Sequence, residues 1–495
     1  GLVYVCADDP GMNSSGTEPD SRHFAPHMKM PMLEPADSQE CKDFTKRAFE
    51  LSEQFDTPFM LRTTVRVNHG SSIVTLEDRV EVPVKHYERD IMKNTNIPAL
   101  ARNKHKTVEE RLVRLQEFSN ETDLNRVELH DTKIGVICAG ICYQYAREVF
   151  GDGASYLKLG FTYPMPDRKI REFAAQVDKL YVLEELDPFI EDYVRGLGIE
   201  CTGKAVLPLY LEYSADIIRR ALGLPGVSAA YEAPVQAPVR PASFCAGCPH
   251  RGTYMGIEAG LKKAGLKKKD VLITGDIGCT ILGISPPFEI LWTELAMGAS
   301  IPLAQGFAYS NIPSPIIATI GDSTFFHAGM TGLVNAVQHH INMTVVILDN
   351  GWTAMTGMQV NPGTVQSCQM GEWQQLDLIQ VVKGLGISEE NLYVVDPYDH
   401  LSVADAVKEC LEKDGVKLIL SRRECAIQAA RRKVKYSPVK VIPEKCIMCR
   451  KCIHVSGCPA ITLGENSIAL DPSTCNNCGL CAQVCPVGAI EKQAE

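Results

Sequence analysis

The sequence predicts an α/β protein of several doubly wound domains, followed by a small cysteine-dense domain. Short apolar runs rich in β-branched residues alternate with segments whose apolar residues recur at helical spacing, as in βαβ units. The length of 495 residues corresponds to three or four domains. Of the 19 cysteines, eight fall within the last fifty residues, which sets the end of the chain apart from the rest.

Composition narrows the class of protein. The apolar fraction is 45%, enough for several cores, and the formal net charge is −10, so we expect neither nucleic acid nor an anionic membrane surface as a partner. No apolar run reaches transmembrane length and no secretory signal opens the chain, so we expect a cytoplasmic protein. In a reducing compartment, crowded cysteines indicate metal or cluster ligands rather than disulfides.

Changes in composition divide the chain into domains and connectors. A charged, helical segment separates two α/β regions, and a stretch rich in Pro and Ala indicates a linker before a third. A short basic segment then precedes the cysteine-dense tail. We therefore predict α/β domains at 1–110, 131–227 and 243–430, a connector at 111–130, a linker at 228–242 and a separate tail domain at 438–495.

The first α/β region opens with a predicted strand at residues 2–6. Asp37 or Ser38 is placed to cap a helix with one apolar face, and residues 59–65 predict the next strand. The chain starts at Gly1 rather than at a methionine, and a domain seldom begins within a sheet. We expect that a natural N-terminal part is missing from this sequence, either as a separate chain or as an omitted segment.

The second α/β region carries strand patterns at residues 134–138 and 180–185, with a helix at 143–150 between them. No catalytic motif is recognisable there, so we expect a structural role.

The most informative segment is 315–357. Apolar runs at 315–320 and 343–348 flank a helical segment, which predicts a buried βαβ unit. Asp322 follows the first strand and Asn350 the second, at the carboxyl ends where ligands bind in α/β sheets. A carboxylate, an amide and a backbone carbonyl match the oxygen ligands of Mg²⁺, and the helix that starts after Ser323 favours a diphosphate.

This spacing resembles the signature of thiamine diphosphate (TPP) enzymes, Gly-Asp-Gly followed by Asn about thirty residues later. Here the segment reads Gly-Asp-Ser, because Ser323 replaces the third Gly, and Asn350 lies 28 residues after Asp322. The alternative is an ordinary βαβ unit in which the Asp and the Asn only form turns. The Gly-Trp-Thr-Ala-Met-Thr-Gly segment after Asn350 favours the cofactor.

The tail carries two similar runs of cysteines, each ending in Cys-Pro. The pattern resembles the bacterial ferredoxin module with two [4Fe–4S] clusters, in which the fourth cysteine of each run binds the other cluster. The first run has two extra residues before Cys458, so its loop must bulge. Zinc is the alternative, although zinc sites use paired Cys-x-x-Cys units. The expected ligands are Cys446, Cys449, Cys452 and Cys485 for cluster 1, and Cys475, Cys478, Cys481 and Cys458 for cluster 2.

A third group of cysteines belongs to the central domain. Cys245 and Cys248 form a Cys-x-x-Cys pair, Cys279 follows a strand in Gly-Asp-Ile-Gly-Cys, and Cys425 follows the last strand. Four thiolates there could hold a further [4Fe–4S] cluster. The alternative is small buried hydrophobic cysteines, which are common in cores.

Together these motifs identify the chain as a relative of the 2-oxoacid:ferredoxin oxidoreductases, and it resembles the large subunits of the indolepyruvate-type enzymes. The motifs are the TPP signature, Cys-Ala-Gly-Cys-Pro-His-Arg, Gly-Asp-Ile-Gly-Cys, the double ferredoxin module, and the N-terminal Ala-Asp-Asp-Pro-Gly-Met-Asn-Ser-Ser and Pro-Ala-Asp-Ser-Gln-Glu. The resemblance implies TPP-enzyme-type folds: the remainder of a pyrimidine-binding domain, a transketolase-C-like domain and a diphosphate-binding domain.

The resemblance also implies site residues. Asp322, Asn350 and the carbonyl of Trp352 would hold Mg²⁺, and Ser323 and His250 would belong to the cofactor site. Cys245, Cys248, Cys279 and Cys425 sit where related pyruvate enzymes bind a proximal cluster. The glutamate that activates TPP in the family is expected outside this chain, so no residue here is assigned its catalytic role.

The implied reaction is oxidative decarboxylation of an arylpyruvate to an acyl-coenzyme A (CoA) and CO₂, with electrons passed through the clusters to ferredoxin. The implied partners are a small beta subunit, in an α2β2 assembly, and ferredoxin. Two alternatives remain open. One is a non-oxidative TPP-dependent 2-oxoacid decarboxylase, and the other is a non-catalytic electron-transfer subunit.

Overall fold

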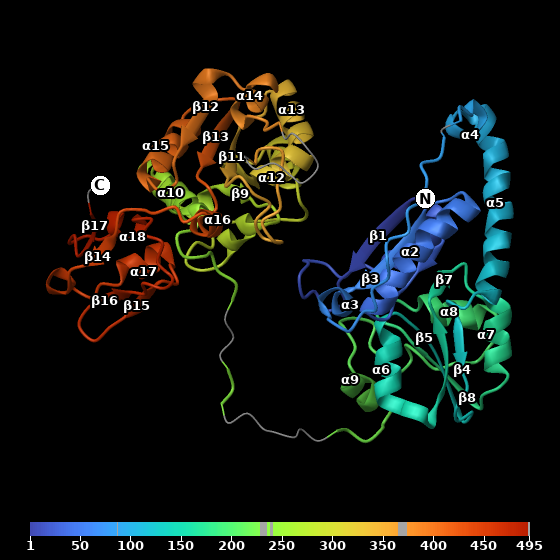
Figure 1. Ribbon diagram of the computed structural model, residues 1–495. Helices are drawn as coiled ribbons and strands as arrows, with labels where there is room; N and C mark the ends of the chain where they lie inside the picture. Colours follow the sequence, from blue (N-terminus) through green and yellow to red (C-terminus); the bar gives the residue numbers. More distant parts are fainter. Residues whose placement is uncertain (87, 228–234, 238–240, 365–373, 494–495) are drawn as a thin grey trace. The chain divides into compact units, whose positions relative to one another are not determined.

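The structure is a computed structural model that describes residues 1–495 except 87, 228–234, 238–240, 365–373 and 494–495 (Figure 1). The chain forms two compact units, Gly1–Pro234 and Val235–Glu495. Most of the linker predicted at 228–242 lies outside the described residues.

The first unit contains two four-stranded sheets in the part of the chain that is described. The predicted strands at 2–6, 59–65, 134–138 and 180–185 are confirmed. One sheet has the order β1-β3-β2-β7, with strands Val3–Asp8, Phe59–Thr64, Met32–Leu33 and Phe161–Tyr163. The other has the order β4-β6-β5-β8, with strands Arg126–Glu128, Ser155–Leu159, Ile134–Ala139 and Lys179–Leu183.

The helices of this unit cover the two sheets. They are η1 Ser21–His23, α1 Phe24–Met28, α2 Ser38–Phe55, α3 Val65–His69, α4 Ile91–Asn94, α5 Pro98–Glu121, α6 Ile141–Phe150, η2 Gly151–Gly153, α7 Asp167–Ala174, α8 Phe189–Gly196 and α9 Ala215–Ala221.

The two α/β regions of this unit are joined more closely than their sequence patterns indicate. Helix α5 begins at Pro98, inside the first predicted domain, and β4 follows it in the predicted connector. Strand β7 comes from the second region but pairs antiparallel with β2 of the first sheet. A buried ionic network also links them: Arg62 binds Asp8 at 2.8 Å and Glu34 at 2.7 Å, and Arg22 binds Glu184 at 2.5 Å.

The second unit is built on a parallel sheet of order β12-β13-β11-β10-β9 in its described part. The strands are Leu392–Val395, Val416–Arg422, Met343–Asp349, Ile316–Gly321 and Leu272–Thr274. The helices are α10 Pro249–Lys263, η3 Lys268–Asp270, η4 Cys279–Ile284, α11 Ser300–Tyr309, α12 Asp322–Thr324, the π-helix η5 Phe325–Gly329, α13 Met330–Gln338, α14 Leu378–Gly384, η6 Glu389–Asn391, α15 His400–Leu411 and α16 Ala426–Arg431.

Helices cover both faces of this sheet, which confirms the doubly wound class (Figure 1). Alternate residues of β10 pack into the cores on the two faces of the sheet, because successive side chains of a strand point to opposite sides. Ala318 belongs to a core with residues of α11, α13 and α14, whereas Ile317 belongs to a core with residues of α10 and α15. Both cores consist of buried aliphatic and aromatic side chains, so the strand ends are held by packing on either side.

The cysteine-dense tail consists of two antiparallel strand pairs and short helices. Strand β14 Val439–Val441 pairs with β17 Ile490–Lys492, and β15 Ile461–Leu463 pairs with β16 Ile468–Leu470. The helical segments are η7 Pro443–Lys445, α17 Lys451–Ser456 and α18 Leu480–Gln483.

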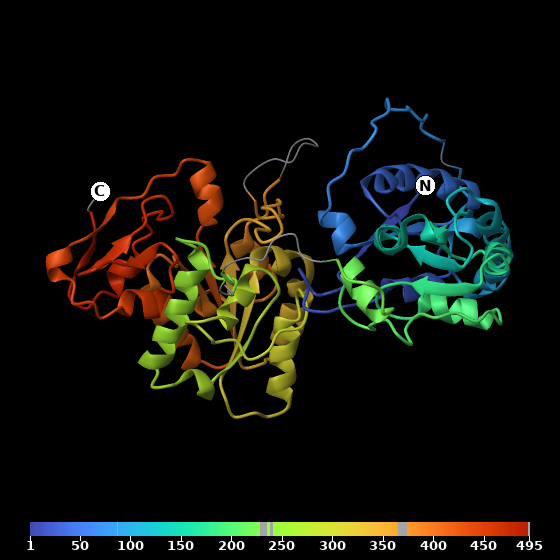
Figure 2. The same cartoon turned by 90° about the horizontal axis from the view of Figure 1, so that it is seen from below.

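The tail packs against the α/β domain rather than forming the separate module that its sequence predicts (Figure 2). Leu480 lies in the same apolar cluster as Phe244 and Tyr254 of the α/β domain. A side chain at Gly247 would meet the side-chain amide of Asn476 at 1.9 Å, so Asn476 of the tail packs directly on the backbone of Gly247. These contacts place the tail and the α/β domain in one unit.

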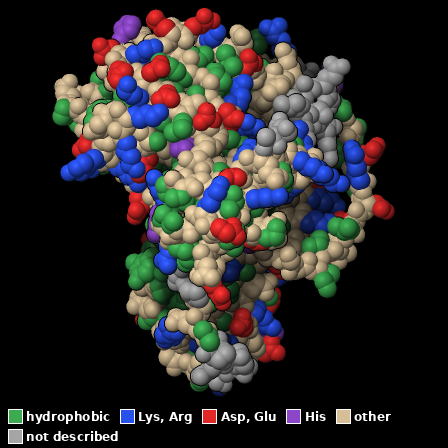
Figure 3. All heavy atoms as spheres, turned by 90° about the vertical axis from the view of Figure 1, so that its left-hand side faces the viewer, with side chains coloured by type: hydrophobic (Ala, Val, Ile, Leu, Met, Phe, Trp, Pro, Cys, Tyr) green, Lys and Arg blue, Asp and Glu red, His purple; other side chains and the backbone are tan. Residues whose placement is uncertain are grey.

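None of the helices in the described part of the chain combines the length and apolar character that crossing a bilayer requires. On the face drawn in Figure 3, Lys and Arg side chains are interspersed with Asp and Glu side chains.

The structure identifies Asp37, rather than Ser38, as the N-cap of α2, because its side chain accepts a hydrogen bond from the Glu40 amide at 2.9 Å. We predict that Asp37→Ala lowers the free energy of unfolding by about 1 kcal/mol. Ser38→Ala is the matched control and should change it by no more than about 0.5 kcal/mol. Urea unfolding of the two variants tests the assignment, and equal losses would contradict it.

Candidate functional site

The predicted site residues meet at one edge of the parallel sheet. Asp322 follows β10, Asn350 and Trp352 follow β11, Cys279 follows β9, and Cys425 follows β13. Because the strands are parallel, their carboxyl ends lie at the same edge. The structure therefore brings together residues from four separate parts of the sequence.

Asp322 is a buried carboxylate, only 3% exposed, at the start of the short helix α12. Burial, and then the neighbouring Asp349, raise the pKa of Asp322 to about 7. Its Oδ2 accepts a hydrogen bond from Asn361 at 2.8 Å. The chain continues into a π-helix at Phe325–Gly329, an irregularity that is frequent at functional sites. A buried carboxylate beside a second acid favours a bound cation.

Asn350 is held in one orientation by two hydrogen bonds. Its Nδ2 lies 3.2 Å from Nε2 of His250, and its Oδ1 accepts from the Trp352 amide at 3.0 Å. Burial lowers the pKa of His250 to about 4, so the ring is neutral at pH 7 and can accept the amide hydrogen. Gly351 makes this turn with a φ of 74°, which favours glycine. His250 therefore acts on the site through Asn350.

These residues fit a magnesium diphosphate by the chemistry of their donors. The carboxylate of Asp322, the amide of Asn350 and the backbone at Trp352 are hard oxygen donors of the kind that Mg²⁺ selects. The unfavourable proximity of Asp322 and Asp349 would be relieved by a divalent cation. Ser323 contributes through its hydroxyl, which shares a hydrogen bond with Thr353 at 2.6 Å.

Two buried polar residues of this edge were missed by sequence reasoning. Asn361 orients Asp322, although it lies 39 residues further along the chain. Asp276 accepts from the Gly298 amide at 2.7 Å, and burial raises its pKa to about 6. The Gly-Asp pair at 275–276 repeats the Gly-Asp of 321–322, which could have signalled Asp276. No local pattern marks Asn361.

The third group of cysteines is assembled next to Asp322. Burial, and then Cys425, Cys245 and Asp322, raise the pKa of Cys279 to about 11. Burial and the same neighbourhood, Cys279 first, raise the pKa of Cys248. The Cys425 amide donates to the backbone oxygen of Asn350 at 3.0 Å, which ties this group to the strand end. These four thiols are outside any disulfide and influence one another electrostatically, so their chemistry fits a group held by four cysteines.

The tail holds two further sets of four cysteines, each around its own cavity. One cavity is lined by Cys446, Cys449, Cys452 and Cys485, and the other by Cys458, Cys475, Cys478 and Cys481. Each set thus takes its fourth member from the other run, as the ferredoxin pattern predicts. Backbone amides already point at sulfur atoms, since Ala489 N lies 3.2 Å from Cys485 Sγ. Such N–H donors stabilise thiolates bound to iron.

Two family comparisons match separate parts of the chain. Residues 276–420 match the family described as thiamine pyrophosphate enzyme, C-terminal TPP binding domain. Residues 468–491 match the 4Fe-4S binding domain family. The first match spans the strand ends with Asp322 and Asn350, and the second covers the end of the tail.

Curated relatives match over the whole chain. Indolepyruvate oxidoreductase subunit IorA of Methanothermobacter thermautotrophicus is 36% identical, over 100% of this chain and 82% of the relative. The IorA subunit of Archaeoglobus fulgidus is also 36% identical, over 99% and 81%. Among solved structures, a 2-oxoglutarate:ferredoxin oxidoreductase from Magnetococcus marinus is 20% identical with a TM-score of 0.34, covering 38% of this chain and 65% of that one.

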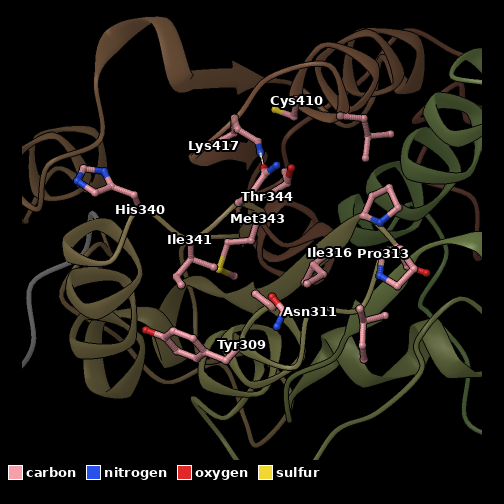
Figure 4. A pocket seen from close by; sticks show the side chains of 16 residues that line it. Tyr309, Asn311, Pro313, Ile316, His340, Ile341, Met343, Thr344, Cys410 and Lys417 are labelled. Carbon is pink, nitrogen blue, oxygen red and sulfur yellow. Dashed lines mark hydrogen bonds between the residues drawn. The ribbon is translucent and has the colours of Figure 1, made fainter.

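A cavity of about 510 Å³ lies at the opposite edge of the sheet, where the strands begin (Figure 4). Lys417, which is 2% exposed, lines it and donates to Asn342 Oδ1 at 2.5 Å and to Gly415 O at 2.8 Å. Burial lowers the pKa of Lys417 to about 8. The predicted site residues do not line this cavity.

We predict that Lys417 makes the stability of the protein rise with pH. Between pH 8 and 10.5 the folded protein binds fewer protons at Lys417 than the unfolded chain does, so its free energy of unfolding increases across this window. The gain is up to about 3 kcal/mol, at 1.36 kcal/mol per pKa unit. In Lys417→Met this increase in the free energy of unfolding between pH 8 and 10.5 should be absent. Urea unfolding at pH 8 and pH 10 measures it, with the exposed Lys408→Met as control, and a pH response of Lys417→Met equal to that of the wild type would contradict the prediction.

Proposed function

This chain belongs to the indolepyruvate oxidoreductase subunit IorA family, and from that premise we propose that it carries the cofactor-binding and electron-transfer parts of a 2-oxoacid:ferredoxin oxidoreductase acting on arylpyruvates. In the reaction, the 2-oxoacid and CoA yield acyl-CoA, CO₂ and one proton, while two ferredoxins each gain one electron. The chain binds TPP and iron–sulfur clusters, in keeping with its two domain families.

One observation carries the proposal: the four-cysteine group of the α/β domain lies beside the TPP-binding strand ends. Asp322 is close enough to Cys279 to raise the pKa of its thiol, and the Cys425 amide donates to the backbone oxygen of Asn350 at 3.0 Å. A decarboxylase without oxidation needs no electron acceptor at that position. A cofactor site in contact with a cluster site is the arrangement that an oxidative decarboxylation requires.

The chain's own residues position the groups that react. TPP, when bound, supplies the nucleophile and the electron sink for decarboxylation. Asp322, Asn350 and the Trp352 carbonyl would hold Mg²⁺ and, through it, the diphosphate. His250 and Asn361 fix the side chains of Asn350 and Asp322, and the burial of all four keeps water from competing for the cation.

The three cysteine sets form a route away from the cofactor. The set with Cys245 would hold the cluster that accepts electrons first. The tail set with Cys458 lies against the α/β domain, because the cavity that it lines also includes Gly247 and Arg251. The tail set with Cys449 lines a cavity formed by tail residues alone, and it would deliver electrons to ferredoxin. A small beta subunit and CoA complete the proposed system.

The function is tested with the chain and its small subunit under anaerobic conditions. Indolepyruvate or phenylpyruvate, CoA and oxidised ferredoxin should give aryl-acyl-CoA and two reduced ferredoxins per CO₂, with slower turnover of pyruvate and 2-oxoglutarate. Release of an aldehyde without ferredoxin reduction would instead identify a non-oxidative decarboxylase. Reducible clusters without TPP binding or turnover would identify an electron-transfer subunit.

The cluster assignment predicts about twelve irons per chain after anaerobic purification, four for each of three [4Fe–4S] clusters. Changing Cys245 and Cys248 together to Ser should reduce this to about eight, because the tail sets stay complete. Cys41→Ser, a half-buried cysteine of the first unit, is the control and should change nothing. Iron and sulfide analysis decides it; zinc in place of iron, or no loss in the double variant, would refute the assignment.

The magnesium assignment predicts that Asp322→Ala weakens TPP binding at least tenfold, because Mg²⁺ loses its one charged protein ligand. The fold and the iron content should be retained, since Asp322 lies at a strand end outside all three cysteine sets. Calorimetric titration of TPP in the presence of Mg²⁺ measures the effect, with the exposed Asp405→Ala as control. If Asp322→Ala binds TPP with unchanged affinity, Asp322 is not a ligand of the Mg²⁺ ion.

A further inference from the structure

A buried arginine lies between two of the cysteine sets. Arg251 is in the first turn of α10 and is 1% exposed. Its guanidinium donates to the backbone oxygens of Ser456 in the tail, Phe244 at 2.6 Å and Cys245 at 3.2 Å. These bonds join the start of the α/β domain to the end of helix α17, so Arg251 occupies the boundary between the two parts.

The positive charge of Arg251 has no carboxylate partner within ion-pair distance among the residues that the structure describes. The titratable groups close to it are cysteines of both sets: Cys458 and Cys478 of the tail, and Cys248 and Cys245 of the α/β domain. A buried charge without a counter-charge is costly, and three neutral carbonyl oxygens do not neutralise it. The structure therefore lacks the negative charge that would balance this guanidinium.

A second, independent observation concerns the Nε atom of Arg251. It is buried and has no hydrogen-bond acceptor within the described protein. Buried donors are almost always paired, so an unpaired one next to a ligand site indicates an acceptor that the bound group supplies. The sulfur atoms of a cluster are such acceptors, and donors to sulfur are one of the features that set cluster potentials.

We propose that Arg251 is a positioning and tuning residue for electron transfer: its buried guanidinium and its Nε–H stabilise the reduced forms of the clusters in the α/β domain and in the adjacent tail set. The proposal rests on the function proposed above. A four-thiolate cluster is anionic and gains one more negative charge on reduction, so a buried cation favours the reduced form and raises the potential. One cation shared by both sets raises both potentials together, so it favours reduction of both clusters with little effect on the difference between them. The outer set, around Cys449, lies outside this effect because Arg251 lines the cavity of the adjacent tail set and not that of the outer set.

The test is a redox titration of the full chain followed by electron paramagnetic resonance, after iron analysis. Arg251→Gln removes the charge but keeps donors for the carbonyl oxygens. With iron content at the wild-type level, we expect the two inner potentials to fall by at least 59 mV, a tenfold change in the ratio of reduced to oxidised cluster for a one-electron couple. The outer potential should not move. Arg450→Gln is the control, because Arg450 is an exposed arginine that lines the outer set, and it should leave the inner potentials unchanged.

Fully loaded Arg251→Gln with wild-type potentials would overturn the proposal and leave Arg251 as a structural clamp between the tail and the α/β domain. Should the Gln variant lose iron, Arg251→Lys takes its place. Lysine keeps the charge but has no Nε–H, so the same two potentials should fall by a smaller amount, and wild-type values would again overturn the proposal. A wild-type content of about eight irons would show that the α/β domain holds no cluster. The adjacent tail potential alone would then decide the role of Arg251.

Discussion

The shared direction of the sheet strands is the constraint on which this site depends. Four parallel strands, packed between helices on both faces, end at one edge of the sheet. The residues that follow these strands therefore lie close together at that edge. This is why a carboxylate from position 322, an amide from 350 and thiols from 279 and 425 come within reach of one another. The cores beneath them are made of aliphatic and aromatic side chains that fix each strand end in place.

A second property of the site is that its titratable side chains are already buried in the protein without cofactor or clusters. Asp322 lies beside Asp349, the thiols of Cys248 and Cys279 are crowded, and Arg251 lacks a carboxylate. Each of these is unfavourable in the protein alone, and each is relieved by a group of opposite charge. Because these groups lower the free energy of unfolding of the unliganded protein, their partners raise it again on binding. The cofactor and the clusters should therefore stabilise the fold as well as react.

The parts of this structure that the sequence predicted are those that depend on patterns of neighbouring residues in the chain. Apolar runs with β-branched residues located β10 and β11 because a buried strand needs them, and Cys-x-x-Cys spacing predicted which tail cysteines line each of two cavities. Asn361 and Arg251 could not be predicted, because their roles come from neighbours 39 and 205 residues away. Strand β7 was missed for the same reason: its three residues join a sheet whose other strands lie in the first 64 positions.

The crossed arrangement of the tail cysteines has a consequence for how the protein is made. The set with Cys446 closes only with Cys485, and the set with Cys458 needs Cys481, so both remain incomplete until these late cysteines have been synthesised. The group with Cys245 becomes complete earlier, at Cys425. The proposed cluster site of the α/β domain would therefore have all of its cysteines before either tail set does. The order of biogenesis would then follow the order of electron flow.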